Sequence, residues 1–484
     1  MMTFLEPARP AARPLRLNLV LAICCLSLFI VSMDATIVNV ALPAIRRDLQ
    51  ATTSGLQWIV DAYTLVVASV TMLSGSLADR FGRRRTFQTG LTVFTLASTL
   101  CSIAPNLHAL VGARMLQALG GSMLNPVAMS IITNTFLDPK ARARAIGVWG
   151  AVFGISAVLG PLVGGTLTQS VGWRSIFWIN VPIGVAAILL AQRFVPESKA
   201  PRARRVDPIG QLFVSLAFGS TIYATIEGNR LGWSSPLILG LFTLALCSLV
   251  GILIYEPRQR EPLLDLRFFR SIPFSSATII AVSMFSALSG FGFLNALYLQ
   301  EVRGLSALQA GLYMVPLALG TILSSPISGR LIGRYGTRIP LAISGSMTAL
   351  SGLALTRLDV ATPLSELVCV YLIFGIAVGL VNPPITNTAV SGMPRAQAGL
   401  AAAIASTSRL FGASLGVAIS GTLAGDRHVG LAFTQSTHAF WWLMAGAGSL
   451  CVFLGLLSNG RSARASVARI AALLDDAAPF AEVK

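Results

Sequence analysis

Charged side chains are scarce in this sequence. Asp, Glu, Lys and Arg make up only 11% of its 484 residues, whereas soluble domains contain about 25%. Hydrophobic residues make up 54%, and the mean hydropathy is +0.73. This deficit of charge excludes an ordinary soluble domain and places most of the chain in lipid.

Motifs for nucleotide hydrolysis and for enzyme catalysis are also missing. The sequence has no G-x-x-x-x-G-K-[ST] phosphate loop, so ATP is not its direct energy source. It shows no catalytic triad and no cluster of metal ligands. Its six cysteines lie in or beside apolar runs without disulfide or metal spacing, as small hydrophobic residues do. We therefore predict a protein that is not an enzyme and holds no metal and no cofactor.

Long apolar runs are what the sequence has instead. A helix that crosses a bilayer needs about 20 mainly apolar residues. Barrel strands are excluded because they are short and alternate in polarity. We predict an all-α membrane protein with fourteen spans, at 16–44, 54–79, 85–104, 107–134, 143–168, 174–195, 207–226, 236–255, 273–301, 308–332, 337–356, 364–390, 396–424 and 436–458.

The net charge of +17 follows the predicted topology. The N-terminus, every second loop and the tail together hold 27 Lys and Arg, the opposite loops hold 7, and Arg114 and Arg409 fall inside helices. Cytoplasmic loops are enriched in Lys and Arg. This placement predicts that both termini are cytoplasmic, in a multi-pass protein of the bacterial inner membrane. It also explains the basic charge without a nucleic-acid partner.

The sequence contains a weak internal repeat. The segment at 75–84 reappears in part at 329–338, and Asn125-Pro126 reappears as Asn382-Pro383. Parallel repeats around a midplane site are a transporter architecture. We predict an N-terminal six-helix half (1–196), two inserted linker helices (197–262), a C-terminal six-helix half (263–458) and a cytoplasmic tail (459–484). The tail is expected to be either a short amphipathic surface helix or disordered.

Five motifs in order resemble the major facilitator superfamily, and within it the fourteen-span family of drug:proton antiporters. The resemblance covers nearly the whole chain and implies the major facilitator fold. The motifs are MDATIVNVALP (33–43), GSLADRFGRRR (75–85), ARMLQALGGSMLNP (113–126), GPLVGG (160–165) and WRSIFWINVPIG (173–184).

Ionisable residues inside the predicted spans are the leading functional candidates. A charge in the bilayer costs about 2.5–3.5 kcal/mol on insertion scales and usually marks function. Asp34, Asp61 and Arg114 fall at a similar depth in the predicted outer third. We predict that they form a coupled cluster, with Asp34 as the first proton site, Asp61 as a second proton or cation site, and Arg114 tuning both. The alternatives are that Asp34 caps a helix break and that Asp61 is solvated among headgroups.

Two further motifs concern the movement of the halves. The resemblance implies that Asp79, Arg80 and Arg83 form a conformational latch between the halves, and Gly82 permits the tight turn there. Positive-inside topology alone is the alternative for the arginines. Small residues and a proline in the fifth span predict a close, bent seam, with generic packing as the alternative: Gly154, Gly160, Pro161, Gly164 and Gly165.

The substrate site of such a protein is expected midway between the halves. Aromatic rings can hold an organic cation, although most aromatics in a bundle serve packing. The candidates for lining this site are Tyr63, Gln117, Asn125, Trp149, Phe153, Phe291, Asn295, Tyr298, Tyr313 and Asn382.

These observations predict a multidrug efflux protein of the proton antiporter type. It would export small amphipathic, cationic drugs or metabolites by alternating access, with the proton gradient as its energy source. Its partners would be the small-molecule substrate and the lipid bilayer. One alternative is a proton-driven exporter of one endogenous metabolite, anionic or neutral, with Arg114 and Arg409 as ligands. Another is a lipid flippase. The sequence does not name a periplasmic adaptor.

Overall fold

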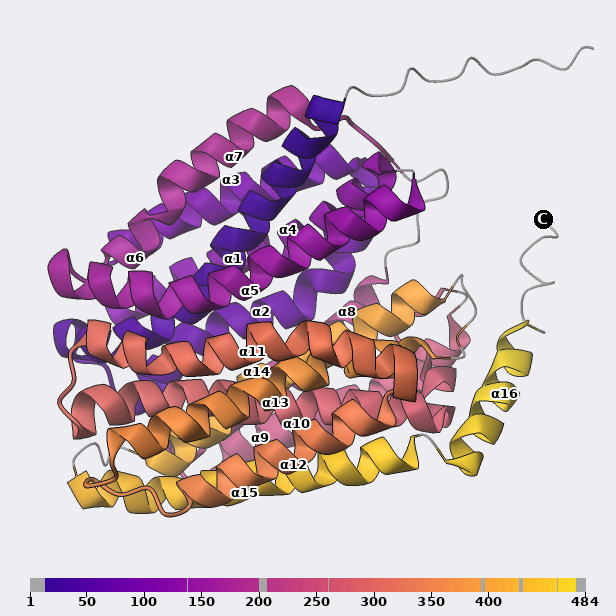
Figure 1. Ribbon diagram of the computed structural model, residues 1–484. Coiled ribbons are helices and arrows are strands. Elements are labelled where there is room, and N and C mark those ends of the chain that lie inside the picture. The colour runs from indigo at the N-terminus through magenta and orange to yellow at the C-terminus, as the bar shows by residue number, and fades with distance from the viewer. Residues whose placement is uncertain are drawn as a thin grey trace, which may run out of the picture.

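The computed structural model describes residues 14–136, 138–199, 207–259, 261–391, 393, 397–425, 430–458 and 460–475. Every regular element within these ranges is helical (Figure 1). The helices before the middle of the chain are α1 (Pro14–Leu49), α2 (Thr53–Phe81), α3 (Arg83–Ser102), α4 (Leu107–Thr135), α5 (Pro139–Ser170), α6 (Ser175–Trp178), α7 (Asn180–Phe194), α8 (Pro208–Leu231) and α9 (Pro236–Tyr255).

Two short 3-10 turns, η1 (Glu256–Arg258) and η2 (Leu266–Arg270), lead into the second part of the chain. The π-helical turn η3 (Tyr298–Val302) continues α10. The remaining helices are α10 (Ile272–Leu297), α11 (Ala307–Tyr335), α12 (Arg338–Leu355), α13 (Leu364–Val390), α14 (Ala398–Ala424), α15 (Gly430–Leu457) and α16 (Arg461–Asp475).

Each of the fourteen predicted segments coincides with a helix, with α6 and α7 sharing one of them. Within the described residues, twelve helical stretches are long and apolar enough to cross a membrane. Among the predicted spans, those outside this set are α3, which begins with three arginines, and α12, an 18-residue helix that begins with Arg338. An all-helical membrane fold is therefore confirmed, whereas fourteen crossings and the orientation of the termini stay predictions.

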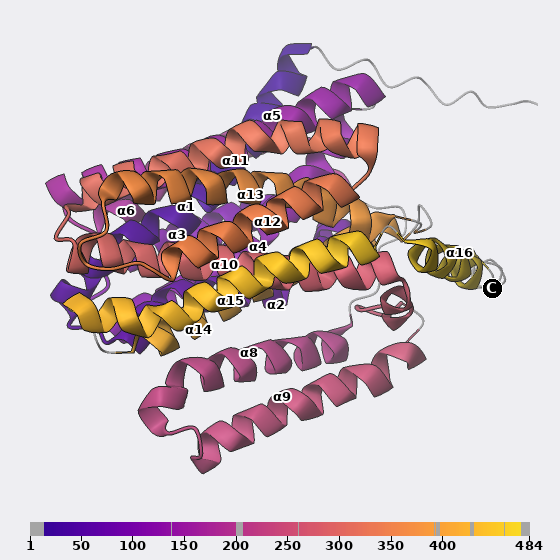
Figure 2. The same cartoon turned by 60° about the horizontal axis from the view of Figure 1, so that its bottom comes forward.

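The long helices form two groups that lie side by side (Figure 1). In the first group α1 packs on α5, and α4 packs on α2 and α3. In the second, α10 packs on α14, α11 on α13, and α12 on α15. The pair α8 and α9 lies on the outside of the bundle, where α8 contacts α2 and α14 (Figure 2). The two groups meet mainly through α5 with α11 and α2 with α14.

The bundle has one closed end and one open end. We call the end where α1 finishes the Leu49 end and the end where α1 begins the Pro14 end. At the Leu49 end the two groups are joined by an ion pair between Arg46 and Glu301 (2.7 Å) and by a hydrogen bond from Gln57 to the Ala418 carbonyl (2.7 Å). These bonds hold α1 to η3 and α2 to α14.

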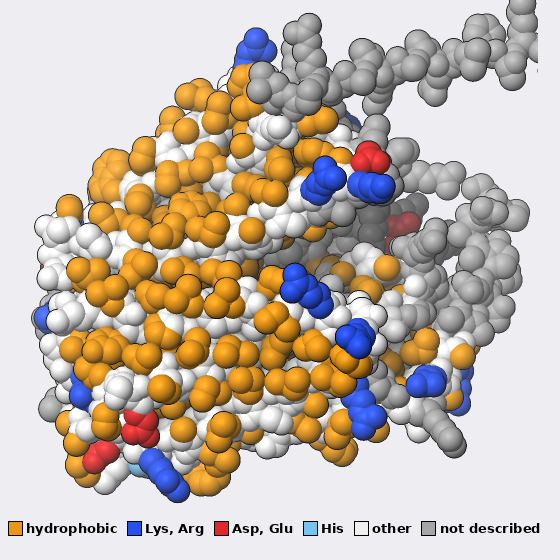
Figure 3. Space-filling model, viewed as in Figure 1, with side chains coloured by type: hydrophobic (Ala, Val, Ile, Leu, Met, Phe, Trp, Pro, Cys, Tyr) orange, Lys and Arg blue, Asp and Glu red, His pale blue; other side chains and the backbone are white. Residues whose placement is uncertain are grey.

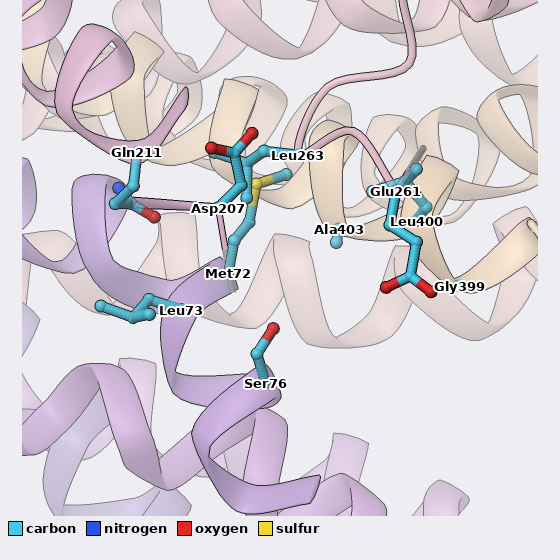
Figure 4. Close-up of a pocket in the computed structure, with 10 residues that line it drawn as sticks. All are labelled: Met72, Leu73, Ser76, Asp207, Gln211, Glu261, Leu263, Gly399, Leu400 and Ala403. Atoms are coloured by element: carbon cyan, nitrogen blue, oxygen red, sulfur yellow. The ribbon is translucent and has the colours of Figure 1, made fainter. Parts of the chain in front are cut away.

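Toward the Pro14 end a pocket lies between α2, α14 and the start of α8. Figure 4 shows this pocket, and Figure 3 shows a recess at the same end of the bundle, on the face that α5 and α11 cover. Lys and Arg side chains gather at this end in Figure 3. The walls of the pocket are formed by three sets of residues: Met72, Leu73 and Ser76 of α2, Gly399, Leu400 and Ala403 of α14, and Asp207, Gln211, Glu261 and Leu263 at the start of α8 and in the loop that precedes η2.

The tail forms helix α16, which was one of the two predicted alternatives. It docks at the Pro14 end, where the Ser466 hydroxyl accepts a hydrogen bond from the Ile272 backbone N–H (3.1 Å) and Ile470 is buried. Its position on a membrane surface stays a prediction, and residues 476–484 lie outside the described part of the chain.

The seam between α5 and α11 gives the first test. A Cβ on Gly165 would lie 2.6 Å from the Ala307 carbonyl oxygen, whereas a Cβ on Gly150 would meet nothing within 4 Å. We expect Gly165→Ala to destabilise the protein by about 1–3 kcal/mol through overpacking and to lower its melting temperature in detergent. Gly150→Ala is the matched control in the same helix and is expected to melt like the wild type. Equal melting of the two variants would contradict this packing.

Candidate functional site

A buried ion pair lies at the centre of the first helix group. Asp34 of α1 has no exposed surface and Arg114 of α4 is 2% exposed. The Arg114 Nη1 donates to the Asp34 Oδ2 over 2.5 Å. Two charges this far from water are tolerated only when each is paired and hydrogen-bonded.

Neutral side chains complete the bonding of this pair. The Gln117 Oε1 accepts from Arg114 (2.6 Å), and its Nε2 donates to the Asp34 Oδ1 (2.9 Å) and to the Ser98 hydroxyl (2.8 Å). The Asn180 Nδ2 donates to the same Asp34 oxygen (3.0 Å). Both carboxylate oxygens are therefore occupied, and the network ties α1, α3, α4 and α7 together.

Aromatic rings cover the faces of the Arg114 guanidinium. Its central carbon lies 4.3 Å from the centre of the Tyr63 ring and 5.8 Å from that of Phe177, within the range of cation–π attraction. Its Nε donates to the Ile59 carbonyl (3.2 Å). Arg114 is thus held by α1, α2 and α6 at once, which leaves its side chain little freedom.

The pairing of Arg114 with Asp34 agrees with the sequence-based expectation. All hydrogen bonds described for Asp34 come from side chains, which does not fit the alternative role of capping a helix break. Ser98 and Asn180 were missed because neutral polar residues in apolar helices carry no signal of their own. Gln117 was expected in the substrate site but belongs to this network. Proton exchange at Asp34 stays a prediction.

Asp61 does not join this cluster, which corrects the predicted three-residue site. Its Oδ1 accepts from the Ser414 hydroxyl of α14 (2.8 Å), and its buried Oδ2 has no hydrogen-bond partner. Asp61 lies one turn from Gln57, which also contacts α14. Depth along the helices predicted that Asp61 lies at the level of Asp34 and Arg114. Which residues it contacts depends instead on the face of α2 that carries it, and Asp61 faces the second group. With no exposed surface, it is not solvated among headgroups.

Helix α5 lies between α1 and α11, beside the ion pair. A Cβ on Gly160 would collide with the Thr36 hydroxyl, two residues from Asp34, and one on Gly164 would lie 2.6 Å from the Ile37 Cγ1. On the other side of the helix, the Cβ position of Gly311 in α11 touches the carbonyl of Pro161. Gly154 faces Ile322 of α11 at 3.0 Å. The predicted glycine motif therefore provides close contact with both groups.

The predicted latch residues contact only the first group in this structure, as far as the described bonds show. Asp79 pairs with Arg83 (2.9 Å), and the Arg80 guanidinium lies over the Phe81 ring. Gly82 has φ of +111°, and a Cβ there would lie 2.6 Å from Glu197 Oε1. The turn therefore requires glycine. Contact of the latch with the second group stays a prediction.

The predicted lining residues divide into two sets. Phe291, Asn295 and Tyr298 are buried in the core of the second group, where Asn295 bonds to the Phe291 carbonyl and Tyr298 to the Asp359 carbonyl. Helix α10 is apolar on most of its circumference, so the sequence did not show which face is internal. Tyr63 covers Arg114, as described above. The residues with partial or full exposure are Asn125, Trp149, Phe153, Tyr313 and Asn382.

Comparison with known proteins identifies the family. The family model described as Major Facilitator Superfamily matches residues 24–417. The chain is 38% identical to the multidrug resistance protein Stp of Mycobacterium tuberculosis, over 82% of this chain and 74% of that protein. It is 33% identical to a methylenomycin A resistance protein of Bacillus subtilis (90% and 93% covered). It is 34% identical to a tetracenomycin C resistance and export protein of Streptomyces glaucescens (82% and 74% covered).

The buried ion pair gives the second test. Arg114→Gln would leave the Asp34 carboxylate buried without a cation, and loss of one partner costs about 3–5 kcal/mol. We expect a large fall in melting temperature in detergent, part of which is recovered in the double variant Asp34→Asn/Arg114→Gln. Arg174→Gln breaks the exposed pair with Asp48, whose side chains are 41% and 46% exposed, and serves as the control with an effect below about 1 kcal/mol. A double variant less stable than Arg114→Gln would contradict the pairing.

Proposed function

This chain belongs to the major facilitator superfamily of membrane transporters, which are not enzymes, and from that premise we propose that it is a proton-coupled antiporter. In this proposal it exports small amphipathic drugs or metabolites by alternating access. Several relatives are named for resistance to, or export of, quite different compounds, which supports drug efflux here.

The observation that carries the proposal is the position of Asp61. This carboxyl group lies in the interface between the two helix groups, with one oxygen bonded to Ser414 and the other unpaired and buried. An ionised carboxylate is costly to bury without a partner. A bound proton would therefore stabilise the closed Leu49 end, and loss of the proton would favour separation of α2 from α14.

The orientation turns this effect into coupling. We propose fourteen spans with both termini in the cytoplasm of a bacterial cell, so that the Leu49 end faces outward. The structure then represents a state open to the cytoplasm. A proton taken up from outside would bind Asp61 and stabilise the closed outer end. The proton would then leave toward the cytoplasm and the substrate would bind. The outer end could then reopen and release the substrate. Closure of the cytoplasmic end would bring Asp79, Arg80 and Arg83 to the second group as a latch.

Asp34 is the second coupling group in this proposal. Its carboxylate is held by Arg114, Gln117 and Asn180 in the present state. Protonation of Asp34 would weaken its bond to Arg114. Asp34 is two residues from Thr36, which packs closely against Gly160 of α5. Since α5 contacts both groups there, a change at Asp34 would reach the seam. We propose two six-helix halves, at 1–196 and 263–458, as the moving parts.

The charge of the substrate is open to two proposals. A cationic drug would compete with the proton at Asp61, because both oxygens of Asp34 are already bonded. Partly exposed aromatic residues such as Trp149 and Tyr313 would assist its binding. An anionic or neutral molecule is the second candidate, and the position of Arg409 favours it.

Transport measurements test the coupling. We expect an imposed pH gradient to drive ethidium across the membrane of liposomes that contain the purified protein, in the direction opposite to proton flow. Asp61→Asn is expected to lower this gradient-driven movement at least tenfold, because the amide cannot exchange a proton. Ethidium counterflow without a gradient should be retained. Asp48→Asn, which removes an exposed carboxylate from the same protein, is the control. Full coupling in Asp61→Asn would refute its role and leave Asp34→Asn as the variant to measure.

The closed end gives a fourth test. Arg46→Glu would place two carboxylates together at the contact with Glu301 and prevent its closure, whereas the swap Arg46→Glu/Glu301→Arg restores opposite charges. We expect transport to fall at least fivefold in Arg46→Glu and to recover in part in the swap. A swap no more active than the single variant would show that this ion pair does not control closure.

A further inference from the structure

Arg409 is a cation in the middle of a membrane helix without a carboxylate partner among the described residues. It lies near the centre of α14, and its Nη1 donates to the Asn382 Oδ1 (3.2 Å) and the Thr386 hydroxyl (3.0 Å). Both partners are neutral. Arg114, the other arginine inside a span that the sequence singled out, is instead fully neutralised by Asp34.

The unused hydrogen-bonding capacity of Arg409 is large. A guanidinium group has five N–H donors in a planar fork. Only the Nη1 is bonded in the described structure, and the side chain is partly exposed. A cation at this depth costs about 2.5–3.5 kcal/mol on insertion scales and usually faces a water-filled cavity or a ligand. The Nε and Nη2 donors are therefore available to water or to a bound ligand.

The surroundings of Arg409 show which way it faces. The partly or fully exposed side of α13 at this level carries Asn382, Thr386 and Asn387, and Ser406 lies one turn before Arg409 in α14. Polar side chains at membrane depth face the interior of a bundle rather than lipid. We therefore expect this polar strip to face the interior of the bundle, between the two helix groups.

The first group offers a matching but uncharged surface. Asn125 of α4 is the repeat counterpart of Asn382, is partly exposed, and has an Oδ1 without a hydrogen-bond partner. Trp149 of α5 has an indole N–H without a partner. Neither Asn125 nor Trp149 carries a charge. Arg409 is therefore the one unpaired cation described on these two polar surfaces.

We propose that Arg409 binds an oxygen acceptor of the transported molecule, such as a carbonyl, phenolate or carboxylate oxygen. This inference rests on the proposed export function and names the chemistry of its substrate. Asn382 and Thr386 hold one side of the guanidinium, so its free edge is oriented before the substrate arrives. The Phe285 ring lies 5.9 Å from the guanidinium carbon and provides an apolar wall for the body of an amphipathic molecule.

A conformational role is the rival explanation. Arg409 and Asp61 both lie on helices of the interface between the groups, and movement of α14 could bring the two charges together in another state. In that case loss of Arg409 would impair coupling for every substrate equally. Selective loss of oxygen-bearing substrates distinguishes ligand binding from this role.

Binding to the full-length purified protein tests the inference. The probes are fluorescein, with carboxylate and phenolate oxygens, 7-amino-4-methylcoumarin, with a neutral lactone carbonyl, and ethidium, a cation with no oxygen. We expect Arg409→Gln to weaken binding of the two oxygen-bearing probes at least tenfold relative to ethidium. Arg409→Lys retains the charge but not the fork and should lose bidentate binding of fluorescein more than binding of the coumarin.

The controls separate this inference from folding and from the proposed function. Arg174→Gln removes a distant exposed arginine and should bind all three probes like the wild type. Melting curves check each variant, and Arg409→Lys substitutes for Arg409→Gln if the latter does not fold. Equal affinity of the wild type and the Arg409 variants for the oxygen-bearing probes, including no binding by any of them, overturns the inference. The proposed antiport is refuted in a separate measurement, if the wild type couples the movement of none of the three probes to a pH gradient.

Discussion

The high cost of an unpaired charge in an apolar interior governs this structure. Only 11% of the residues are charged, so each ionisable side chain inside the bundle needs a partner, a water-filled space or a ligand. Asp34 and Arg114 meet the requirement by pairing, and Gln117 and Asn180 occupy their remaining bonds. Since these residues come from α1, α4 and α7, one buried charge pair fixes the packing of the first helix group.

The same requirement operates differently where the groups meet. Asp61 has one bond, from Ser414 across the interface, and its second oxygen is buried without a partner. A group left incomplete in this way makes the stability of the interface depend on its protonation. Glycines at the seam of α5 with α1 and α11 keep the backbones close, so a small change in side-chain bonding reaches both groups.

The sequence predicted the helices and the existence of the charge pair but not how the helices face one another. Length and hydropathy were sufficient for the fourteen segments, and depth along each helix predicted that Arg114 would meet Asp34. Depth could not show that Asp61 faces α14, because that depends on rotation about the α2 axis and on a partner more than three hundred residues away. Nor could it find Asn180 or Ser98, since a neutral polar residue in an apolar run gives no indication of its partner. Phe291 and Asn295 were misjudged as candidates for the same reason, because an almost uniformly apolar helix does not show its internal face.

The two helix groups are related by the internal repeat, but their intramembrane arginines have different roles. In the first group the intramembrane arginine is neutralised and fixed, so it can support coupling but has no free donor for a ligand. In the second group Arg409 has only neutral partners and a partly exposed edge. If both arginines were paired, neither of them would have a free donor for a substrate. If both were unpaired, the first group would lose the bond that holds α1 to α4. A fixed charge pair on one side and an available cation on the other allows a single bundle to remain stable and still recognise what it transports.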